Sequence, residues 1–141
     1  MDKFDTLKLS NQLCFPLYAC SREIIKKYNS PLKGIGLTYP QYITMMVLWE
    51  KKEISVRDLG KELHLDSGTL TPLLKNMESK GLLTRQRSSK DERLLIVSIT
   101  HEGEQLKEKA LEVPPKMAAC VKLTPQEAQT LYNLLYKLLE D

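Results

Sequence analysis

The chain has 141 residues, the length of one compact domain, which excludes a protein with two catalytic domains. Hydrophobic residues make up 42% and charged residues 28%, so the chain can bury a core, while its net charge of +3 by itself indicates no polyanionic partner. It lacks an apolar run of the roughly 20 residues that span a bilayer and the hydrophobic region of a signal peptide, so we expect a cytoplasmic protein without a membrane partner.

Two helices are predicted in the first third of the chain. The first spans residues 11–29, where apolar side chains recur at helical spacing at Leu13, Leu17, Ile24, Ile25 and Tyr28. Ser30-Pro31 and the glycines of residues 34–36 are typical of a break after this helix. The second helix spans residues 40–50, and its apolar composition predicts that it is mostly buried.

The middle of the chain has the pattern of a helix-turn-helix. Its first helix spans residues 56–63 and ends at the turn His64-Leu65. Asp66 or Ser67 caps the second helix, which ends near Gly81. The inward face of this second helix consists of Leu70, Leu73, Leu74 and Met77.

Two strand-like runs follow at residues 82–87 and 94–100. The segment between them, residues 88–93, is polar and lacks glycine, so we expect a loop longer than a two-residue turn. A hairpin directly after a helix-turn-helix is the wing of a winged helix.

The last part of the chain predicts two further helices. One begins at Glu102 and is interrupted by Pro114-Pro115, where we expect a kink. A capping box of Thr124 and Glu127, with proline at the first helical position, starts the other. Its apolar stripe over residues 131–139 exceeds what a winged lobe must cover, so it indicates a dimer interface; a larger monomeric core is the alternative.

The positive charge gathers on the wing and on the helix before it. Residues 75–93 carry six basic side chains against three acidic ones, a net +3, whereas residues 51–74 are neutral and residues 101–141 carry −2. Phosphates would be neutralised there if the second short helix entered a groove of DNA. A solvated face is the alternative for any basic hairpin, but its position after a helix-turn-helix favours DNA.

Double-stranded DNA is therefore the expected partner. The outward face of the second short helix is small and polar, which lets base edges and phosphates come close. Arg93 suits the narrow minor groove, and Asp91 is placed to hold its guanidinium in a bidentate pair. The predicted DNA-binding residues are Ser67, Gly68, Thr69, Thr71, Pro72, Lys75, Asn76, Arg85, Arg87, Lys90, Asp91 and Arg93.

Four segments and Tyr18 together resemble the MarR family of winged-helix regulators, and within it the organic-hydroperoxide-sensing branch. The segments are residues 66–75 (DSGTLTPLLK), 90–93 (KDER), 11–15 (NQLCF) and 37–42 (LTYPQY). The resemblance implies a homodimer whose first and last helices intertwine and whose two winged lobes read a pseudo-palindromic operator.

The expected fold class is mainly α, an α+β winged helix-turn-helix with six helices and a two-stranded wing hairpin. We expect one domain over residues 1–141. Residues 39–100 would form the DNA-binding lobe, and residues 11–29 and 101–141 the dimerisation helices.

The three cysteines, Cys14, Cys20 and Cys120, include no CxxC pair, and the two histidines lie far apart. We therefore expect no disulfide framework, metal site, cofactor or catalytic triad. Cys14 shares a helix face with Tyr18 one turn away, although a small buried hydrophobe is the commoner state of a lone cysteine. Cys20 lies on another face and is assigned to packing.

The resemblance implies that Cys14 is the peroxide-reactive thiol, surrounded by Tyr18 and by Tyr28 and Tyr39 of the partner subunit. Phenolic donors favour the thiolate, which attacks a hydroperoxide to give a sulfenic acid. In two-cysteine members of the branch a distal cysteine, here Cys120, resolves the sulfenic acid as an intersubunit disulfide. Core packing of Cys120, or capping of Cys14 by a small cellular thiol, are the alternatives. Pro16 departs from the pattern of the branch. It either starts or kinks the helix near Cys14, and the alternative to a helix start there is that it displaces Cys14 from the tyrosines.

The sequence thus predicts a repressor that releases its operator when an organic hydroperoxide oxidises Cys14. One alternative is a regulator of the same family that responds to a small phenolic or drug-like molecule bound between the lobe and the dimer helices. The other is a small thiol redox enzyme, which gives no reason for the basic wing. We therefore expect no enzymatic activity.

Overall fold

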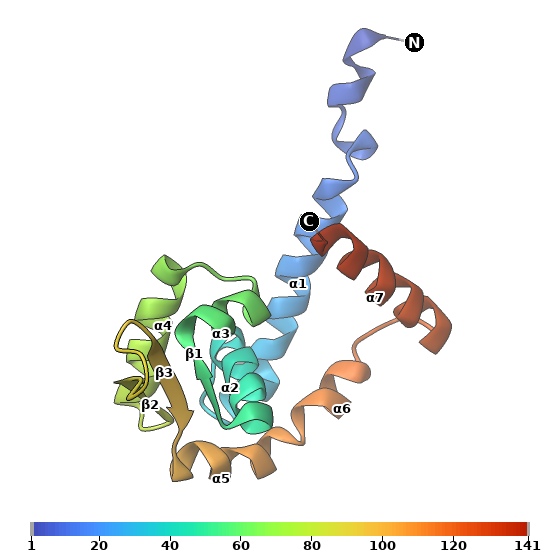
Figure 1. Cartoon of the computed structure of the whole chain (residues 1–141). Coiled ribbons are helices and arrows are strands. Elements are labelled where there is room, and N and C mark those ends of the chain that lie inside the picture. Colours follow the sequence, from blue (N-terminus) through green and yellow to red (C-terminus); the bar gives the residue numbers. More distant parts are fainter. Residues whose placement is uncertain (1, 141) are drawn as a thin grey trace.

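The computed structural model describes residues 2–140, which form a helical lobe with a small sheet and terminal segments that reach away from it (Figure 1). Two short 3-10 turns come first, η1 (Lys3–Leu7) and η2 (Leu9–Asn11). The α-helices are α1 (Cys14–Lys33), α2 (Tyr39–Lys51), α3 (Val56–Leu63), α4 (Ser67–Ser79), α5 (His101–Ala110), α6 (Val113–Ala118) and α7 (Pro125–Leu139). The strands are β1 (Glu53–Ser55), β2 (Leu83–Arg87) and β3 (Leu95–Ile99). Among the described residues, no helix has the length and apolar character needed to cross a membrane.

Helix starts follow the side chains that cap them. The hydroxyl oxygens of Thr38, Ser55 and Thr124 each accept a hydrogen bond from the backbone N–H three residues on, at the starts of α2, α3 and α7. A carboxylate oxygen of Asp66 does the same for α4. The predicted helix-turn-helix, wing strands and last helix are confirmed, with ends within one or two residues.

Two details of the helices differ from the prediction. The break expected at Ser30-Pro31 is wrong, because α1 continues to Lys33 with Pro31 inside its last turn. Leu32 is buried, and its carbonyl oxygen accepts hydrogen bonds from the N–H groups of Ile35 and Leu37, which holds the helix end in place.

The helix expected from Glu102 as one kinked element is two helices, so the described residues hold seven α-helices rather than six. The helix is interrupted at Leu111 and Glu112, and both prolines lie in the first turn of α6. Proline is tolerated there because the first N–H groups of a helix have no partner within it.

The sheet has the strand order β1-β3-β2, and both pairs are antiparallel. Strand β1, which the sequence did not predict, places Ile54 opposite Val97 of β3, while Arg85 of β2 lies opposite Val97 on the other side. The wing hairpin is therefore anchored by a third strand that leads directly into α3.

The core of the described chain extends from Leu32 to Met117 and centres on α2, α4 and the sheet. The inward residues of α4 are placed as predicted, with Leu70, Leu74 and Met77 buried and Leu73 half-buried. Trp49 of α2 donates its indole N–H to the carbonyl oxygen of Gly103 at 2.9 Å, which fixes α5 against the lobe. The lobe is therefore a closed hydrophobic unit that presents α4 and the wing.

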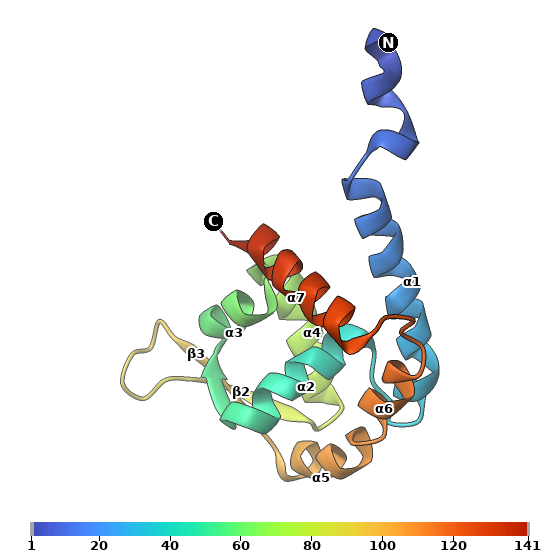
Figure 2. The same cartoon turned by 90° about the vertical axis from the view of Figure 1, so that its right-hand side faces the viewer.

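The terminal segments are arranged differently. Both views show the N-terminal turns projecting away from the lobe, and Figure 1 shows α7 set apart from the lobe after α6 (Figures 1 and 2). Helix α7 has no buried residue, and its apolar stripe Leu131, Leu134, Leu138 and Leu139 is exposed. The larger monomeric core considered from the sequence is therefore not formed.

Candidate DNA interface and thiol site

Helix α4 presents a capped and exposed face. A carboxylate oxygen of Asp66 accepts a hydrogen bond from the backbone N–H of Thr69 at 2.8 Å, and this bond lowers the pKa of Asp66 below its ordinary value. The hydroxyl of Thr71 donates to the carbonyl oxygen of Ser67 at 2.9 Å. All the predicted DNA-binding residues of α4 are exposed: Ser67, Gly68, Thr69, Thr71, Pro72, Lys75 and Asn76.

The wing loop is ordered by local hydrogen bonds. The N–H of Ser88 donates to the carbonyl oxygen of Leu94 at 2.8 Å, which closes the base of the loop. The hydroxyl oxygen of Ser88 accepts from the N–H groups of Lys90 and Asp91. Figure 2 shows this loop extending beyond the body of the lobe. Lys90 of this loop is exposed, as is Arg87 at the end of β2.

Arg85 and Arg93 are the two arginines of the wing that form ion pairs. Arg93 is the more exposed of the two, with 92% of its side chain exposed. Its Nε lies 3.3 Å from a carboxylate oxygen of Asp91, and the same oxygen accepts from the backbone N–H of Arg93 at 3.0 Å. The predicted bidentate pair is therefore wrong, because one carboxylate oxygen takes both donors. The terminal guanidinium nitrogens of Arg93 remain available to a partner.

Arg85 of β2 is held in an ion pair with Glu78 of α4. Its Nε and one terminal nitrogen donate to the same oxygen of Glu78 at 3.2 and 3.1 Å, and its backbone N–H donates to the other oxygen at 3.0 Å. These bonds lower the pKa of Glu78, and the side chain of Arg85 is only 18% exposed. Arg85, predicted as a DNA-binding residue, thus forms an ion pair that joins β2 to α4 and leaves little of its side chain exposed.

Two contributors to this surface were missed by sequence reasoning. Arg57, in the first turn of α3, is exposed and lines a cavity of about 450 Å³ together with Asp91 and Arg93 of the wing. Gln41 of α2 is buried and donates a hydrogen bond to Asn76 of α4 at 2.8 Å. No local sequence pattern predicts either residue, because each makes its contacts with an element that is distant in sequence.

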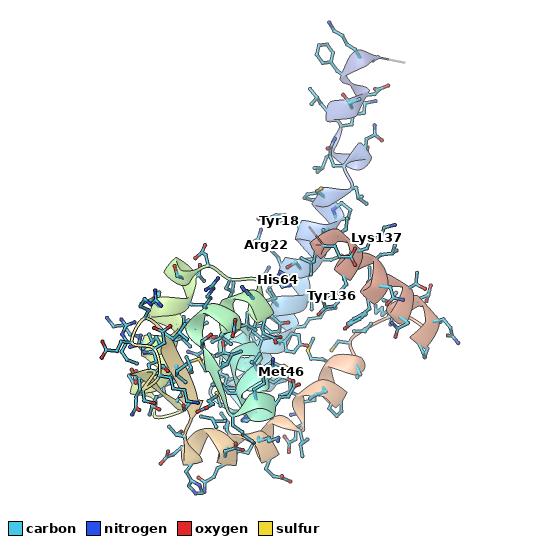
Figure 3. All side chains as sticks on the ribbon, viewed as in Figure 1. Tyr18, Arg22, Met46, His64, Tyr136 and Lys137 are labelled. Atoms are coloured by element: carbon cyan, nitrogen blue, oxygen red, sulfur yellow. The ribbon has the colours of Figure 1, made fainter. Side chains whose placement is uncertain are left out.

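Cys14 is the first residue of α1 and is exposed. Tyr18, one turn further on, is exposed too, and its hydroxyl accepts a hydrogen bond from Arg22 at 3.3 Å. The guanidinium of Arg22 also lies 5.5 Å from the centre of the Tyr18 ring, a cation–π distance (Figure 3). The alternative that Cys14 is a buried hydrophobe does not hold within one chain.

Tyr28 and Tyr39 are brought together, but away from Cys14. Their ring centroids are 4.7 Å apart, and Tyr42 joins the same cluster. Cys14 and Tyr28 are separated by about 21 Å along the axis of α1, at roughly 1.5 Å per residue. Tyrosines 28 and 39 of the same chain therefore do not surround Cys14, and only a partner subunit can supply them there.

The surroundings of the three clustered phenols make them harder to ionise than an ordinary tyrosine, which is itself protonated at neutral pH. Burial raises the pKa of Tyr28, Tyr39 and Tyr42 above the usual value for tyrosine, and the mutual repulsion of the phenolates raises each further. At neutral pH each hydroxyl is therefore a hydrogen-bond donor, the form needed to stabilise a thiolate.

The other two cysteines are exposed as well. Cys120 lies two residues after the end of α6, and its thiol donates to the carbonyl oxygen of Lys116 at 3.4 Å. The assignment of Cys20 to packing is wrong within one chain, because Cys20 lies on a solvent-facing part of α1. Neither thiol fills the core of the lobe.

Several known proteins are similar to this chain in sequence and in architecture. A family model described as transcriptional regulator SarA/Rot matches residues 26–110. The structure of a mutant MarR from E. coli complexed with operator DNA superposes with a TM-score of 0.85, at 24% identity over 99% of this chain and 100% of that chain. An organic hydroperoxide resistance transcriptional regulator of Bacillus subtilis (strain 168) is 48% identical over 139 residues, covering 99% of this chain and 95% of that relative. The chain belongs to the MarR family.

Within the MarR family the chain falls in the organic-hydroperoxide-resistance branch, since its similarity to the Bacillus regulator spans almost the whole sequence. It is similar to AbfR, a protein of Staphylococcus epidermidis, whose overoxidised form bound to DNA has a TM-score of 0.80, 36% identity and coverage of 98% of this chain and 97% of that one. A disulfide-formed AbfR structure has a TM-score of 0.68 at 37% identity, with the same coverage. These relatives are transcription regulators, so this MarR-family chain is a regulator and not an enzyme.

Proposed function

We propose that this MarR-family regulator is a homodimeric repressor that releases its operator when an organic hydroperoxide oxidises Cys14. The observation that carries the proposal is the position of Cys14. It begins α1 on the exposed apolar surface of the terminal segments, where a partner subunit would pack. Chemistry at that thiol therefore acts on the elements that would set the distance between two DNA-binding lobes.

The DNA contacts follow from the exposed surfaces of the lobe. Two copies of α4 in a dimer enter successive major grooves about 34 Å apart, or a multiple of that distance. Arg93 reaches the adjacent minor groove, and the remaining basic side chains neutralise phosphates. The contacting residues are Ser67, Gly68, Thr69, Thr71, Pro72, Lys75, Asn76, Arg87, Lys90 and Arg93, while Arg85 and Asp91 position the wing.

The switch begins with the thiolate of Cys14. Its sulfur attacks the O–O bond of the hydroperoxide, forming a sulfenic acid and releasing the corresponding alcohol after proton uptake. Tyr18 of the same chain, with Tyr28 and Tyr39 of the partner subunit, donates hydrogen bonds that stabilise the thiolate. The thiol of Cys120 of the partner subunit then displaces water from the sulfenic acid, which gives an intersubunit disulfide.

The disulfide alters DNA binding through geometry. Forming it requires the two sulfur atoms to come within about 2 Å, which draws α1 towards the segment after α6 of the partner. Both lobes must dock at once for tight binding, so a shift of a few ångströms in their spacing lowers operator affinity. The structure of disulfide-formed AbfR supports the first part of this step, since a relative of this chain also forms a disulfide.

The deciding experiment is gel-shift binding to the DNA upstream of the chain's own coding sequence, with and without an organic hydroperoxide. Wild type should bind when reduced and release DNA when oxidised, whereas Cys14→Ser should bind in both conditions. On a non-reducing gel the oxidised wild type should run as a covalent dimer, and Cys120→Ser should abolish that band while Cys20→Ser leaves it intact. A covalent dimer persisting in Cys120→Ser would refute the pairing of Cys14 with Cys120.

A cavity of about 660 Å³ bears on the alternative of a ligand-responsive regulator. It lies between Tyr136 of α7 and the segment from β1 to the end of α3, where His64 lines it (Figure 3). Most of its lining is charged, with Lys51, Lys61, Glu53, Asp58 and Glu62 around it. Sites for phenolic or drug-like molecules are mainly apolar, so this cavity does not favour that alternative. A Cys14→Ser variant that still releases DNA with the inducer would support it.

A further inference from the structure

We infer that Gln41 is a positioning residue for DNA binding, because its buried amide fixes which atoms of Asn76 are presented on the outer face of α4. The inference rests on the proposed role of α4 in DNA binding. Gln41 lies in the first turn of α2 and is 5% exposed, whereas Asn76 lies in the last part of α4 and is exposed. The two residues are 35 positions apart in sequence.

The hydrogen bonds around Gln41 determine the orientation of its amide. Its Oε1 faces the backbone N–H of Thr38 at 3.1 Å and the ammonium of Lys80 at 3.1 Å. Both are donors without acceptor capacity, so the atom facing them must be the amide oxygen. The ammonium of Lys80 also donates to the carbonyl oxygen of Gly36 at 3.2 Å, which holds it in place.

The orientation of Asn76 follows from that of Gln41. Because Oε1 faces two donors, Nε2 must face Asn76, and the 2.8 Å contact requires the side-chain oxygen of Asn76 as acceptor. The NH2 group of Asn76 is then left for the exposed side. A surface asparagine without this bond would turn freely and present oxygen or nitrogen in turn. Gln41 therefore converts Asn76 into a fixed donor, suited to phosphate oxygens and to acceptors on base edges.

Fixing the donor in advance improves binding in two ways. No side-chain freedom of Asn76 is lost when DNA arrives, and the wrong orientation, with oxygen facing a phosphate, is excluded. The same bonds hold the C-terminal half of α4 against the start of α2, since Gln41 contacts both Asn76 and Lys80. A role confined to packing would stabilise the lobe without favouring one orientation of Asn76.

Operator affinity of the full-length protein tests the inference in a double-mutant cycle. Gln41→Ala and Asn76→Ala should each weaken binding about tenfold, within the range for one lost base or phosphate contact. If Gln41 acts through Asn76, the double variant should bind like Asn76→Ala alone. Gln129→Ala is the matched control, since Gln129 donates to Asn133 at 3.0 Å on exposed α7 and should leave affinity unchanged.

Gln41→Glu separates positioning from packing, and it guards against a Gln41→Ala variant that folds poorly. The carboxylate keeps the contacts with Thr38 and Lys80 but accepts only, so the NH2 of Asn76 must turn inwards to it and expose oxygen. Operator affinity should fall about tenfold or more without a fall in Tm. In the Asn76→Ala background the same change should have no further effect, which excludes a general effect of the added charge.

The outcomes distinguish this inference from the proposed function. Two results would overturn the positioning role alone, provided that wild type binds operator DNA. One is that Gln41→Glu binds as tightly as wild type. The other is that the losses of affinity caused by Gln41→Ala and Asn76→Ala add in the double variant. Reduced wild type that binds no DNA would overturn the proposed function itself.

Discussion

The winged lobe and the terminal segments treat their apolar side chains in opposite ways. Within residues 39–100, Met46 is the one large hydrophobic residue counted as exposed, whereas eighteen lie on the rest of the described chain, from Phe4 to Leu139. The core around α2, α4 and the sheet also includes Leu32 of α1 and Met117 of α6, while α7 buries no residue at all. Exposed apolar surface on this scale is typical of an interface, so the terminal segments are where the proposed dimer would form.

The largest expected effect comes from charging the termini. Leu134→Glu with Leu138→Glu places two carboxylates on the apolar stripe of α7, where the leucines are 54% and 63% exposed. Each leucine buried in a dimer stabilises it by about 1.5–3 kcal/mol, and two-fold symmetry counts each change twice. The dimer should dissociate to monomers at micromolar concentration in sedimentation, while circular dichroism shows the lobe still folded.

A matched control keeps the added charge and moves it to the opposite face of the same helix. Gln126→Glu with Asn133→Glu should leave the protein dimeric, since helical periodicity turns both positions away from the leucine stripe. Wild type that sediments as a monomer would remove the distinction between the two regions. Loss of helical signal in the leucine variant would show that the lobe depends on the termini.

The lobe was largely predictable from sequence, because its elements are specified by nearby residues. A capping side chain starts α2, α3 and α4, and the apolar period of α4 identifies Leu70, Leu74 and Met77 as its buried face. Strand β1 escaped prediction since three residues show no periodicity, and its strand character comes from pairing with β3. Local signals therefore predict helix starts well and short edge strands poorly.

The candidate site was only partly predictable for a related reason. Exposure of the outer face of α4 follows from the helical period, but the ion pair of Arg85 with Glu78 and the amide pair of Gln41 with Asn76 arise from tertiary packing. The proposed surroundings of Cys14 include a second chain, since Tyr28 of the same chain lies far along α1. The more chains or elements a contact joins, the less of it the sequence pattern shows.

Gly103→Ala tests how tightly the lobe is closed, and it is the second largest effect. An added Cβ would overlap the carbonyl oxygen of Leu82 and lie 2.8 Å from a side-chain carbon of Ile99. Overpacking of this kind costs about 3 kcal/mol, because backbone must move and the bond from Trp49 to Gly103 shifts with it. Denaturant unfolding should show a lower midpoint.

Gly34→Ala is the paired measurement at the end of α1. Its Cβ would meet the carbonyl oxygen of Pro31 at 3.6 Å, an ordinary contact, and its φ of −63° suits any residue. Stability should change by less than about 0.5 kcal/mol. Equal losses at Gly103 and Gly34 would contradict the view that the lobe is packed to its limit while the terminal region retains space.

Arg93→Ala sharpens the same contrast on the DNA side. This side chain is exposed on the wing, so its removal should weaken operator binding by about 1–3 kcal/mol. The dimer and the Tm should be unchanged. The effect should be read from binding titrations at constant salt, with Cys20→Ser as the reference. Unchanged affinity would indicate that Arg93 belongs to a solvated face of the wing and does not contact DNA.

A modest effect on stability is expected at the cap of α4. Asp66→Ala removes the acceptor for the N–H of Thr69 and should lower Tm by a few degrees. Asp66→Asn retains an acceptor oxygen, so its Tm should lie between those of Asp66→Ala and wild type. Because the fold lowers the pKa of Asp66, its ionised form contributes stability above the ordinary value of 3.8, and this contribution is lost as the pH falls through the lowered pKa. The Tm difference between wild type and Asp66→Ala should therefore be full at pH 7 and shrink below about pH 4. A difference independent of pH would assign the effect to the helix propensity of the new residue, and the start of α4 would then owe its stability to packing against α2 rather than to its own cap.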